Sequence, residues 1–380
     1  MQRRCAATDL TLNQRCLDRR NFSKALMALP WLGTLGATQA CAQNRPAAHR
    51  PRAFGAAVRA EQIFGDAAFA AIVAQNCAFI TPEIELNWNK VEPREGELDF
   101  YQADQIADFA SRHGKRMGGH ILLWHLGIPD WAVPGLAAPD GWNLVRRYIA
   151  SVMPRYSAVT DYWEVVNEPL LMGYRMDGLR PTPYLSAFGP TYIDRAFREA
   201  RLFAPHARLS INEFGLEYTY RDEHDRRYHF LRLLERLKKA NVPIDGVGLQ
   251  SHLDLRKNAA FDPAVVADFL HEIADMGLEI RVTELDVKEY DYGASREVRD
   301  MAVADAARRY LDVVMACPAV TQICCWGLSD RFSWLTVTPE DLARGHWPDG
   351  QGPGLNRGLP FDSDMLPKPF WHILQQELGK

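Results

Sequence analysis

The chain of 380 residues lacks the features that mark a membrane protein or a zinc protein. Beyond residue 42 it has no apolar run of about 18 or more residues, the length that a membrane-spanning helix needs, so we expect no membrane span. Only four cysteines follow residue 42: Cys77, Cys317, Cys324 and Cys325. They include no CxxC pair matched by a second pair or by spaced histidines, so we expect no zinc site and infer no disulfide pairing.

The chain also lacks an excess of positive charge once its first 42 residues are set aside. The whole sequence has 44 Lys and Arg against 48 Asp and Glu, and residues 1–42 hold six of the former and two of the latter. The remainder therefore carries a net charge of −8. Such a protein is a poor ligand for nucleic acid or an anionic membrane and suits a neutral substrate.

No linker rich in Pro, Ser or Thr interrupts residues 46–380, and we find no internal repeat, so we expect one domain over residues 43–380. Residues 1–42 differ in character. A basic segment at 19–24 precedes an apolar, small-residue stretch at 25–40, and small residues at 40–42 supply a cleavage position. This layout indicates an export signal resembling a twin-arginine leader, which predicts a periplasmic or extracellular protein. An ordinary Sec signal, a lipid anchor and a cytoplasmic helix are the alternatives.

Short apolar segments alternate with amphipathic stretches along the whole domain. The eight apolar segments are residues 53–58, 79–86, 116–124, 162–166, 208–212, 246–249, 279–283 and 321–326, and helix-like stretches between them include 192–202, 228–240, 263–276 and 298–315. This alternation predicts an α/β fold, a closed parallel (β/α)8 TIM barrel. A doubly wound open sheet is the alternative, but no Gly-rich phosphate loop favours it.

Polar and aromatic residues gather where the predicted strands end. The active site of such a barrel is built at the carboxyl ends of its strands. The residues at these ends are Glu83, His120, Trp124, Asn167, Glu168, Asn212, Gln250, His252, Glu284 and Trp326. We therefore expect one pocket to collect them.

Two glutamates in this set, Glu168 and Glu284, lie 116 residues apart, each directly after an apolar strand. A pair of carboxyl groups across a pocket is the minimum equipment for cleaving a glycosidic bond. One must be protonated to assist the leaving group while the other is ionised, so their surroundings must separate their pKa values. The sequence thus indicates a glycosidase.

Neighbouring residues can support the two carboxyl groups. Asp286 lies two positions after Glu284 and faces the same way on a strand, and His252 on the next strand can bond both carboxylates. Gln250 can reach towards Glu168, and Asn167 can bond the sugar hydroxyl beside the reacting carbon. Trp124, Trp326 and Trp334 offer flat apolar faces for sugar rings, although core packing is the alternative for the first two.

Segments 119–125, 163–169, 248–252, 282–286 and 326–330 resemble, in order, the motifs of glycoside hydrolase family 10, the endo-β-1,4-xylanases. The resemblance runs over nearly all of residues 50–378. It implies a TIM barrel, net retention of configuration and no cofactor. It further implies that Glu168 is the general acid/base and Glu284 the nucleophile, positioned by His252 and Asp286. We expect the substrate to be bound by Glu83, His120, Trp124, Asn87, Phe214, Trp326 and Trp334.

The sequence departs from the family pattern on the side that grips the glycone. Ile84 replaces an Asn, Asn87 replaces a Lys, and Leu126-Gly127 stand where Ser-Gln is usual. Phe214 lies in a segment that reads Asn-Glu-Phe-Gly instead of Asn-Asp-Tyr-Asn. Each lost hydrogen bond should cost on the order of 0.5–1.5 kcal/mol of binding.

We therefore expect a monomeric, metal-free enzyme that hydrolyses a xylan-type polysaccharide or oligosaccharide with retention. A retaining β-glycosidase of shifted specificity, acting on a decorated oligosaccharide or an aglycone-bearing glycoside, is the nearest alternative. A non-catalytic glycan-binding protein is an alternative of another class. A metal-dependent hydrolase is a third, but it would need more ligands at strand ends than His120 and His252.

Overall fold

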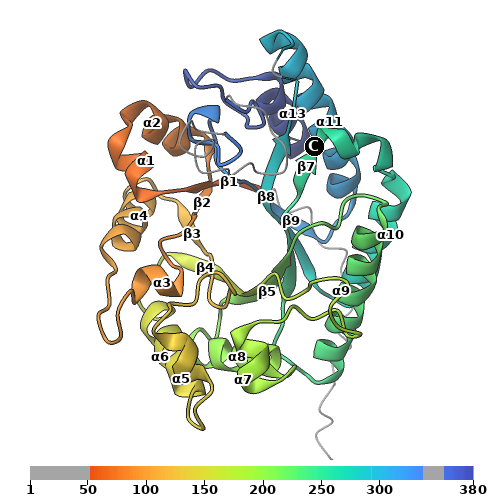
Figure 1. Cartoon of the computed structure of the whole chain (residues 1–380). Helices are drawn as coiled ribbons and strands as arrows, with labels where there is room; N and C mark the ends of the chain where they lie inside the picture. Colours follow the sequence, from red (N-terminus) through yellow and green to blue (C-terminus); the bar gives the residue numbers. More distant parts are fainter. Residues whose placement is uncertain (1–51, 292, 337–354, 380) are drawn as a thin grey trace, which may run out of the picture. The chain divides into compact units, whose positions relative to one another are not determined.

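Eight parallel strands form a closed barrel in the computed structural model, which describes residues 52–291, 293–336 and 355–379. They follow one another around the barrel in sequence order, and the pairing of β6 with β8 closes it (Figure 1). A further short strand, β7, pairs only with the end of β8. The strands are β1 (Ala53–Val58), β2 (Phe79–Pro82), β3 (Arg116–Gly119), β4 (Thr160–Asn167), β5 (Arg208–Glu213), β6 (Gly246–Leu249), β7 (His252–Asp254), β8 (Glu279–Lys288) and β9 (Val320–Cys325).

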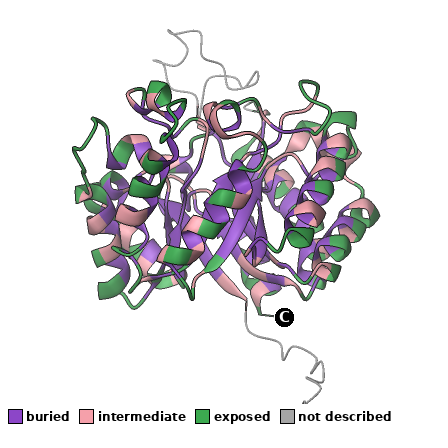
Figure 2. Ribbon diagram, turned by 90° about the horizontal axis from the view of Figure 1, so that it is seen from below, coloured by how far each residue is buried: buried purple, intermediate pink, exposed green. Residues whose placement is uncertain are grey.

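Helices surround this barrel. They are α1 (Ala60–Gly65), α2 (Ala67–Asn76), α3 (Trp88–Val91), α4 (Tyr101–Arg112), α5 (Ala132–Leu136), α6 (Trp142–Val152), α7 (Pro183–Phe188), α8 (Tyr192–Phe203), α9 (Arg221–Lys239), α10 (Pro263–Asp275), α11 (Arg296–Ala316) and α13 (Pro369–Leu378), with 3-10 turns η1 (Leu255–Ala260) and η2 (Asp330–Phe332). Figure 2 shows buried strands enclosed by helices that turn exposed residues outward. The predicted TIM barrel is confirmed.

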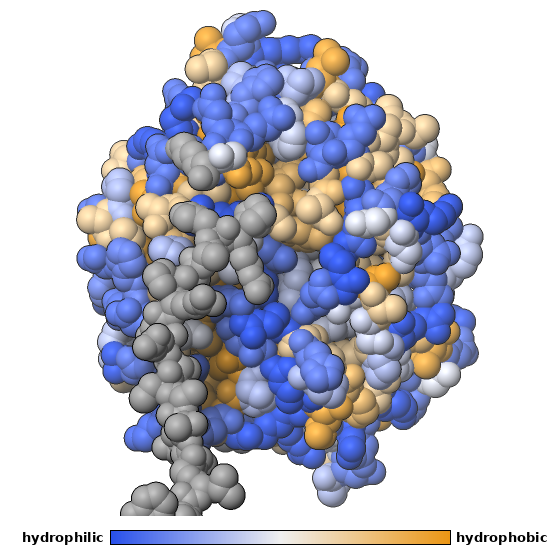
Figure 3. Space-filling view, turned by 180° about the vertical axis from the view of Figure 1, so that it is seen from behind, coloured by the Kyte–Doolittle hydropathy of each residue, from blue (hydrophilic) through white to orange (hydrophobic). Residues whose placement is uncertain are grey.

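The local sequence explains these elements. The strands are covered on both sides and read as nearly continuous apolar runs, as in β6, all of whose residues are buried. Helix α10 begins at Pro263 behind Asp262, whose carboxylate accepts a hydrogen bond from the Ala264 amide at 2.9 Å. On the face shown in Figure 3, hydrophilic residues surround smaller groups of hydrophobic ones. The apolar residues of the strands are thus buried, and the polar residues of the helices face solvent (Figure 2).

Three strands end four or five residues away from the ends that the apolar runs predict, whereas the other strand ends agree to within one residue. Strand β2 stops at Pro82 and β3 at Gly119. Beyond these ends, isolated backbone hydrogen bonds and a bridge from Leu123 to Val166 still join the chain to the neighbouring strands. Strand β8 continues to Lys288 because its last residues pair with β7, His252 opposite Asp286. The polar ends of β2 and β3 are therefore loops, whereas that of β8 is a rigid strand.

Three other predictions concern the export signal, the cysteines and the absence of a membrane span. The export signal predicted at residues 1–42 lies outside the described residues and stays a prediction. The four cysteines after residue 42 are free and buried. Among the described helices, none has the length and apolarity to cross a membrane.

Candidate active site

A cavity of about 580 Å³ opens at the carboxyl ends of the barrel strands. It is lined by all but two of the residues that the sequence predicts for the site: Glu83, His120, Trp124, Asn167, Glu168, Phe214, Gln250, His252, Glu284, Asp286, Trp326 and Trp334. The two exceptions, which are not among the lining residues, are Asn87, buried at the start of α3, and Asn212, buried near the end of β5. One space therefore collects both glutamates.

Glu284 lies in the middle of β8 with only 5% of its surface exposed. Its Oε1 accepts a hydrogen bond from Asn212 Nδ2 at 2.7 Å, and its Oε2 lies 3.2 Å from His252 Nε2. Burial raises the pKa of this carboxyl above its ordinary value, while the bond to His252 opposes the rise. Both oxygens are thus held by hydrogen bonds, and the bond to His252 favours the carboxylate form.

His252 lies between two carboxylates. Its Nδ1 is 2.9 Å from Asp286 Oδ1, and its Nε2 faces Glu284. Burial would lower the pKa of this imidazole, but the two carboxylates outweigh burial and raise the pKa well above its usual value. A charged His252 donates from both ring nitrogens, so it supplies Glu284 with a positive partner.

Asp286 and Trp334 complete this side of the cavity. The second oxygen of Asp286 accepts a hydrogen bond from Trp334 Nε1 at 2.7 Å, and the indole packs edge-on against His252 with ring centroids 5.2 Å apart. The indole is nevertheless 44% exposed. Trp334 is therefore anchored by its nitrogen while part of its ring stays open to the cavity.

Glu168 follows β4 with a left-handed backbone, φ +53°, which few residues other than glycine adopt. Hydrogen bonds hold this turn: the Glu168 amide donates to the Asn212 carbonyl at 2.9 Å, and Arg180 Nε donates to the Glu168 carbonyl at 2.8 Å. The side-chain Oε2 has Arg180 at 3.8 Å and His125 at 4.0 Å. The carboxyl is thus aimed into the cavity by a fixed turn, with a guanidinium beside it.

A chain of side-chain amides joins the two glutamates. Gln250 Nε2 donates at 3.2 Å both to Glu168 Oε1 and to Asn167 Oδ1. The same Asn167 oxygen accepts from Asn212 Nδ2 at 3.0 Å, and Asn212 also donates to Glu284. The amide nitrogens of Gln250 and Asn212 thus use both of their hydrogens, and the Asn167 amide nitrogen donates to Glu168 Oε1 at 3.3 Å. The relative position of the two carboxyl groups is fixed by these amides.

His120 and Trp326 form the wall behind Glu284. His120 Nδ1 lies 2.7 Å from Glu164 Oε2, and the Trp326 ring meets the imidazole edge-on at 5.0 Å. Burial would lower the pKa of His120, but the Glu164 carboxylate outweighs burial and raises the pKa. Ligand atoms of His120, Glu164 and Glu284 lie within 4.8 Å of one another, so this trio is the place where a cation could bind.

The rest of the cavity wall includes both charged and apolar side chains. On one side Glu83 is paired with Arg59 at 2.5 Å, and the apolar Ile84 lines the cavity beside it. On the other side the ring of Phe214 lies 4.2 Å below the Arg226 guanidinium. Trp124 Nε1 is buried and has no hydrogen-bond partner among the described residues.

Sequence reasoning missed or undervalued three residues of this network. Asn212 was placed at a strand end but given no role, although it bonds Glu284. Glu164 stands inside the motif that contains Glu168, and strand alternation could have indicated it. Arg180 lies in a loop well beyond β4, and no sequence signal connects it with Glu168.

Comparison with known proteins agrees with this geometry. The family model for "Glycosyl hydrolase family 10" matches residues 43–376. The endo-1,4-beta-xylanase A of Fusarium oxysporum f. sp. lycopersici is 31% identical over 304 residues, covering 77% of this chain and 84% of that protein. The endo-1,4-beta-xylanase 2 of Aureobasidium pullulans is 33% identical over 281 residues, covering 70% and 74%.

A solved structure shows the same fold. Native xylanase 10B from Thermotoga maritima superposes with a TM-score of 0.75 at 25% sequence identity, covering 87% of this chain and 95% of that one. The resemblance of the strand-end motifs is thereby confirmed over nearly the whole domain. The chain belongs to glycosyl hydrolase family 10 and is a retaining glycoside hydrolase.

Proposed function

We propose that this enzyme hydrolyses β-1,4-xylan-type chains by double displacement, with Glu284 as nucleophile and Glu168 as general acid/base. The observation that carries the proposal is the network around the two glutamates, which surrounds Glu284 with a charged His252 and an amide while leaving Glu168 between neutral amides and Arg180. The relatives named above are endo-1,4-β-xylanases, which supports the choice of substrate.

In the first step a Glu284 oxygen forms a bond to the anomeric carbon as the bond from that carbon to the leaving oxygen breaks. The proton of Glu168 passes to the leaving oxygen, so the departing sugar is neutral and Glu168 becomes a carboxylate. The product is a glycosyl ester on Glu284. Arg180, 3.8 Å from Glu168 Oε2, favours the charge that Glu168 acquires at this stage.

In the second step a water oxygen attacks the same carbon from the face that the leaving group vacated. Its proton passes to Glu168, the ester bond breaks, and Glu284 is released as a carboxylate. Two inversions give net retention. His252 stabilises the negative charge that Glu284 regains, because both its ring nitrogens face carboxylates.

The glycone side of the cavity favours a second candidate, a retaining β-glycosidase of shifted specificity. Ile84 lines the cavity, Asn87 is buried away from it, and Leu126 is 62% exposed. These apolar or withdrawn groups offer fewer hydrogen bonds to a polar sugar than the family pattern does.

Product analysis distinguishes the two candidates. We would incubate the enzyme with plain xylan, decorated xylans and aryl β-glycosides and identify the products by mass spectrometry, with Glu284→Ala as the blank. Short unsubstituted xylo-oligosaccharides released from plain xylan support the xylanase. Absence of products from plain xylan, together with cleavage of a decorated or aryl substrate, supports the second candidate.

Replacing His252 with Gln should move the acidic limb of the pH–kcat/KM profile to higher pH. Glu284 must be ionised to attack, burial raises its pKa, and charged His252 lowers it. Without that charge the pKa of Glu284 rises further, so ionisation requires a higher pH, by roughly one unit or more. His206→Gln, at an exposed site, is the matched control. An unmoved limb would show that His252 does not tune the nucleophile.

Removing divalent cations should leave the rate unchanged. A cation bound to His120, Glu164 and Glu284 would occupy the carboxylate that attacks the sugar, so the proposed mechanism has no use for it. The measurement is xylan hydrolysis before and after dialysis against a chelator. Activity that disappears on dialysis and returns with added Zn²⁺ or Mn²⁺ would contradict the assignment and favour a metal-dependent hydrolase.

A further inference from the structure

Glu213 and Arg226 form a buried ion pair close to the turn that carries Glu168. Glu213 is the last residue of β5 and is fully buried, and Arg226 is a buried residue of α9. Arg226 Nη1 donates a hydrogen bond to Glu213 Oε1 at 3.3 Å. Neither residue lines the catalytic cavity, and the mechanism described above uses neither.

The pair holds the chain two residues beyond Glu168. Glu213 Oε2 accepts a hydrogen bond from the Leu170 amide at 3.0 Å, and Arg226 Nη1 donates to the Leu170 carbonyl at 3.2 Å. We call this arrangement of Glu213 and Arg226 around Leu170 the Leu170 clamp. On the other side of the turn, the Glu168 amide donates to the Asn212 carbonyl at 2.9 Å. Both sides of Glu168 are therefore tied to the end of β5.

The Leu170 clamp needs a carboxylate at Glu213. Three N–H groups meet its two oxygens: the Leu170 amide, Arg226, and the Phe214 amide, which donates to Oε1 at 3.1 Å. Burial raises the pKa of this carboxyl, and the Arg226 guanidinium opposes the rise. The N–H groups favour the ionised form, which accepts hydrogen bonds at both oxygens. A neutral side-chain amide could serve only one side, because its NH₂ group would face a donor on the other.

The departure from the family pattern after β5 makes room for Arg226. The Phe214 ring lies 4.2 Å from the Arg226 guanidinium and 5.8 Å from that of Arg180, which bonds the Glu168 carbonyl. Gly215 has φ +64°, and a Cβ at this position would stand 3.3 Å from Arg226 Nε. A side chain here, such as the Asn of the family pattern, would therefore crowd Arg226.

We propose that Glu213 and Arg226 are positioning residues for Glu168, which hold its carboxyl in line with the leaving oxygen by fixing Leu170. The inference rests on the proposed role of Glu168 as the acid and deepens it. Glu168 has a left-handed backbone, and such a conformation persists only where its surroundings hold it. A loosened Leu170 clamp lets this turn relax, so proton transfer slows while the nucleophile stays in place.

The test compares leaving groups in Glu213→Gln. We expect kcat/KM on xylo-oligosaccharides, whose leaving oxygen needs a proton, to fall by about 10-fold, and kcat/KM on a nitrophenyl β-xylobioside to fall by less than about 2-fold. Arg226→Gln should show the same pattern, and Arg226→Lys, which keeps a charged donor, should restore part of the rate. In the Glu168→Ala enzyme, Glu213→Gln should cause no further loss, because the carboxyl that it positions is gone.

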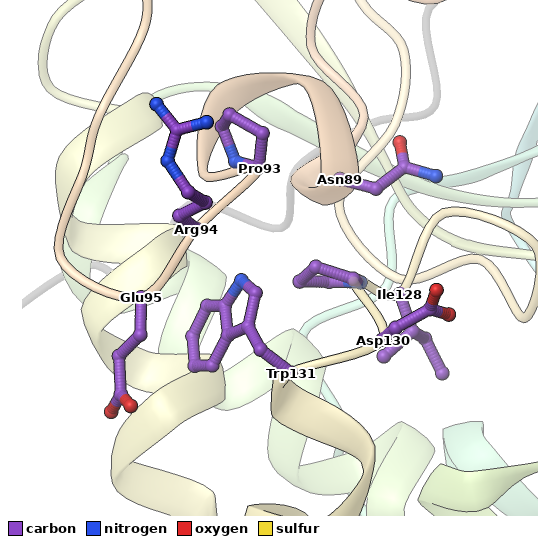
Figure 4. Close-up of a pocket in the computed structure, with 8 residues that line it drawn as sticks. Asn89, Pro93, Arg94, Glu95, Ile128, Asp130 and Trp131 are labelled. Carbon is purple, nitrogen blue, oxygen red and sulfur yellow. The ribbon is translucent and has the colours of Figure 1, made fainter.

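The matched control is Glu92→Gln. Glu92 is also buried, and its Oε1 accepts hydrogen bonds from the Gly96 amide at 2.9 Å and from Arg147 Nη2 at 3.1 Å. Its carbonyl accepts from Trp131 Nε1 at 2.9 Å, and Trp131 lines a hollow of about 460 Å³ that shares no lining residue with the catalytic cavity (Figure 4). A loss of stability alone would affect both substrates equally, as we expect of Glu92→Gln.

An equal loss of kcat/KM on both substrates in Glu213→Gln, or a further loss in the Glu168→Ala enzyme, would show that the Leu170 clamp only stabilises the fold. If Glu213→Gln does not fold, Arg226→Gln and Arg226→Lys decide by the same comparison. If Glu168→Ala itself loses equally on both substrates, the assignment of the acid is wrong and this inference falls with it.

Discussion

Replacing Glu284 with Gln should lower kcat on xylan by at least about 10⁴-fold, because the amide cannot form the glycosyl ester that divides the reaction into two steps. Gln has nearly the shape of Glu, so the hydrogen bond from Asn212 Nδ2 can persist and the substrate should still bind. The measurement is initial rate against substrate concentration, together with the dissociation constant of a xylo-oligosaccharide.

The control for this variant is Glu279→Gln, at the opposite end of the same strand, where the carboxylate bonds Arg208 and Arg281 away from the cavity. Its kcat should stay near that of the unmodified enzyme. Substantial turnover by Glu284→Gln, beyond trace contamination by unmodified enzyme, would show that another group attacks the sugar.

Replacing Glu168 with Ala should separate substrates by their leaving groups. A sugar leaves as a poor alkoxide unless it is protonated, so kcat/KM on xylo-oligosaccharides should fall by about 10²- to 10⁴-fold. A nitrophenolate leaves without a proton, so kcat/KM on a nitrophenyl β-xylobioside should fall far less. We compare kcat/KM because it reports only the formation of the glycosyl ester. In contrast, kcat also depends on hydrolysis of the ester, in which Glu168 is the base.

With the aryl substrate, the Glu168→Ala enzyme should therefore accumulate the glycosyl ester on Glu284. The accumulation would be seen as an initial burst of nitrophenolate followed by slow turnover. Asp161→Asn, exposed near the start of the same strand, provides the comparison. An equal loss of kcat/KM on both substrates would show that Glu168 does not protonate the leaving group.

The barrel could be predicted from the sequence because each buried parallel strand is an apolar run followed by a helical pattern. The strand ends were less accurate. Apolar residues continue past Pro82 and Gly119, where regular pairing with the neighbouring strands ends and only isolated hydrogen bonds and one bridge remain. Strand β8 is longer than its apolar run because Asp286 pairs with His252 of β7, a partner that local composition does not reveal.

The residues around the cavity could be predicted because strand ends meet at one face of a barrel. The contacts among them depend on register, which places Asn167 beside Asn212 and thereby starts the amide chain between the glutamates. Arg180 escaped prediction because its bond to Glu168 spans a loop. Asn87 was expected at the substrate, but the chain turns into α3 there and buries it.

The most direct test of the account is to trap the covalent intermediate. A 2-deoxy-2-fluoro-β-xylobioside with an activated leaving group should form the ester quickly and hydrolyse slowly, because fluorine destabilises the charged transition states of both steps. Peptide mapping by mass spectrometry then locates the added disaccharide. We expect it on Glu284, with one label per chain and recovery of activity as the ester hydrolyses. A label on another residue, or inactivation by the corresponding glucose-based reagent alone, would contradict the assignment of the nucleophile or of the xylan-type substrate.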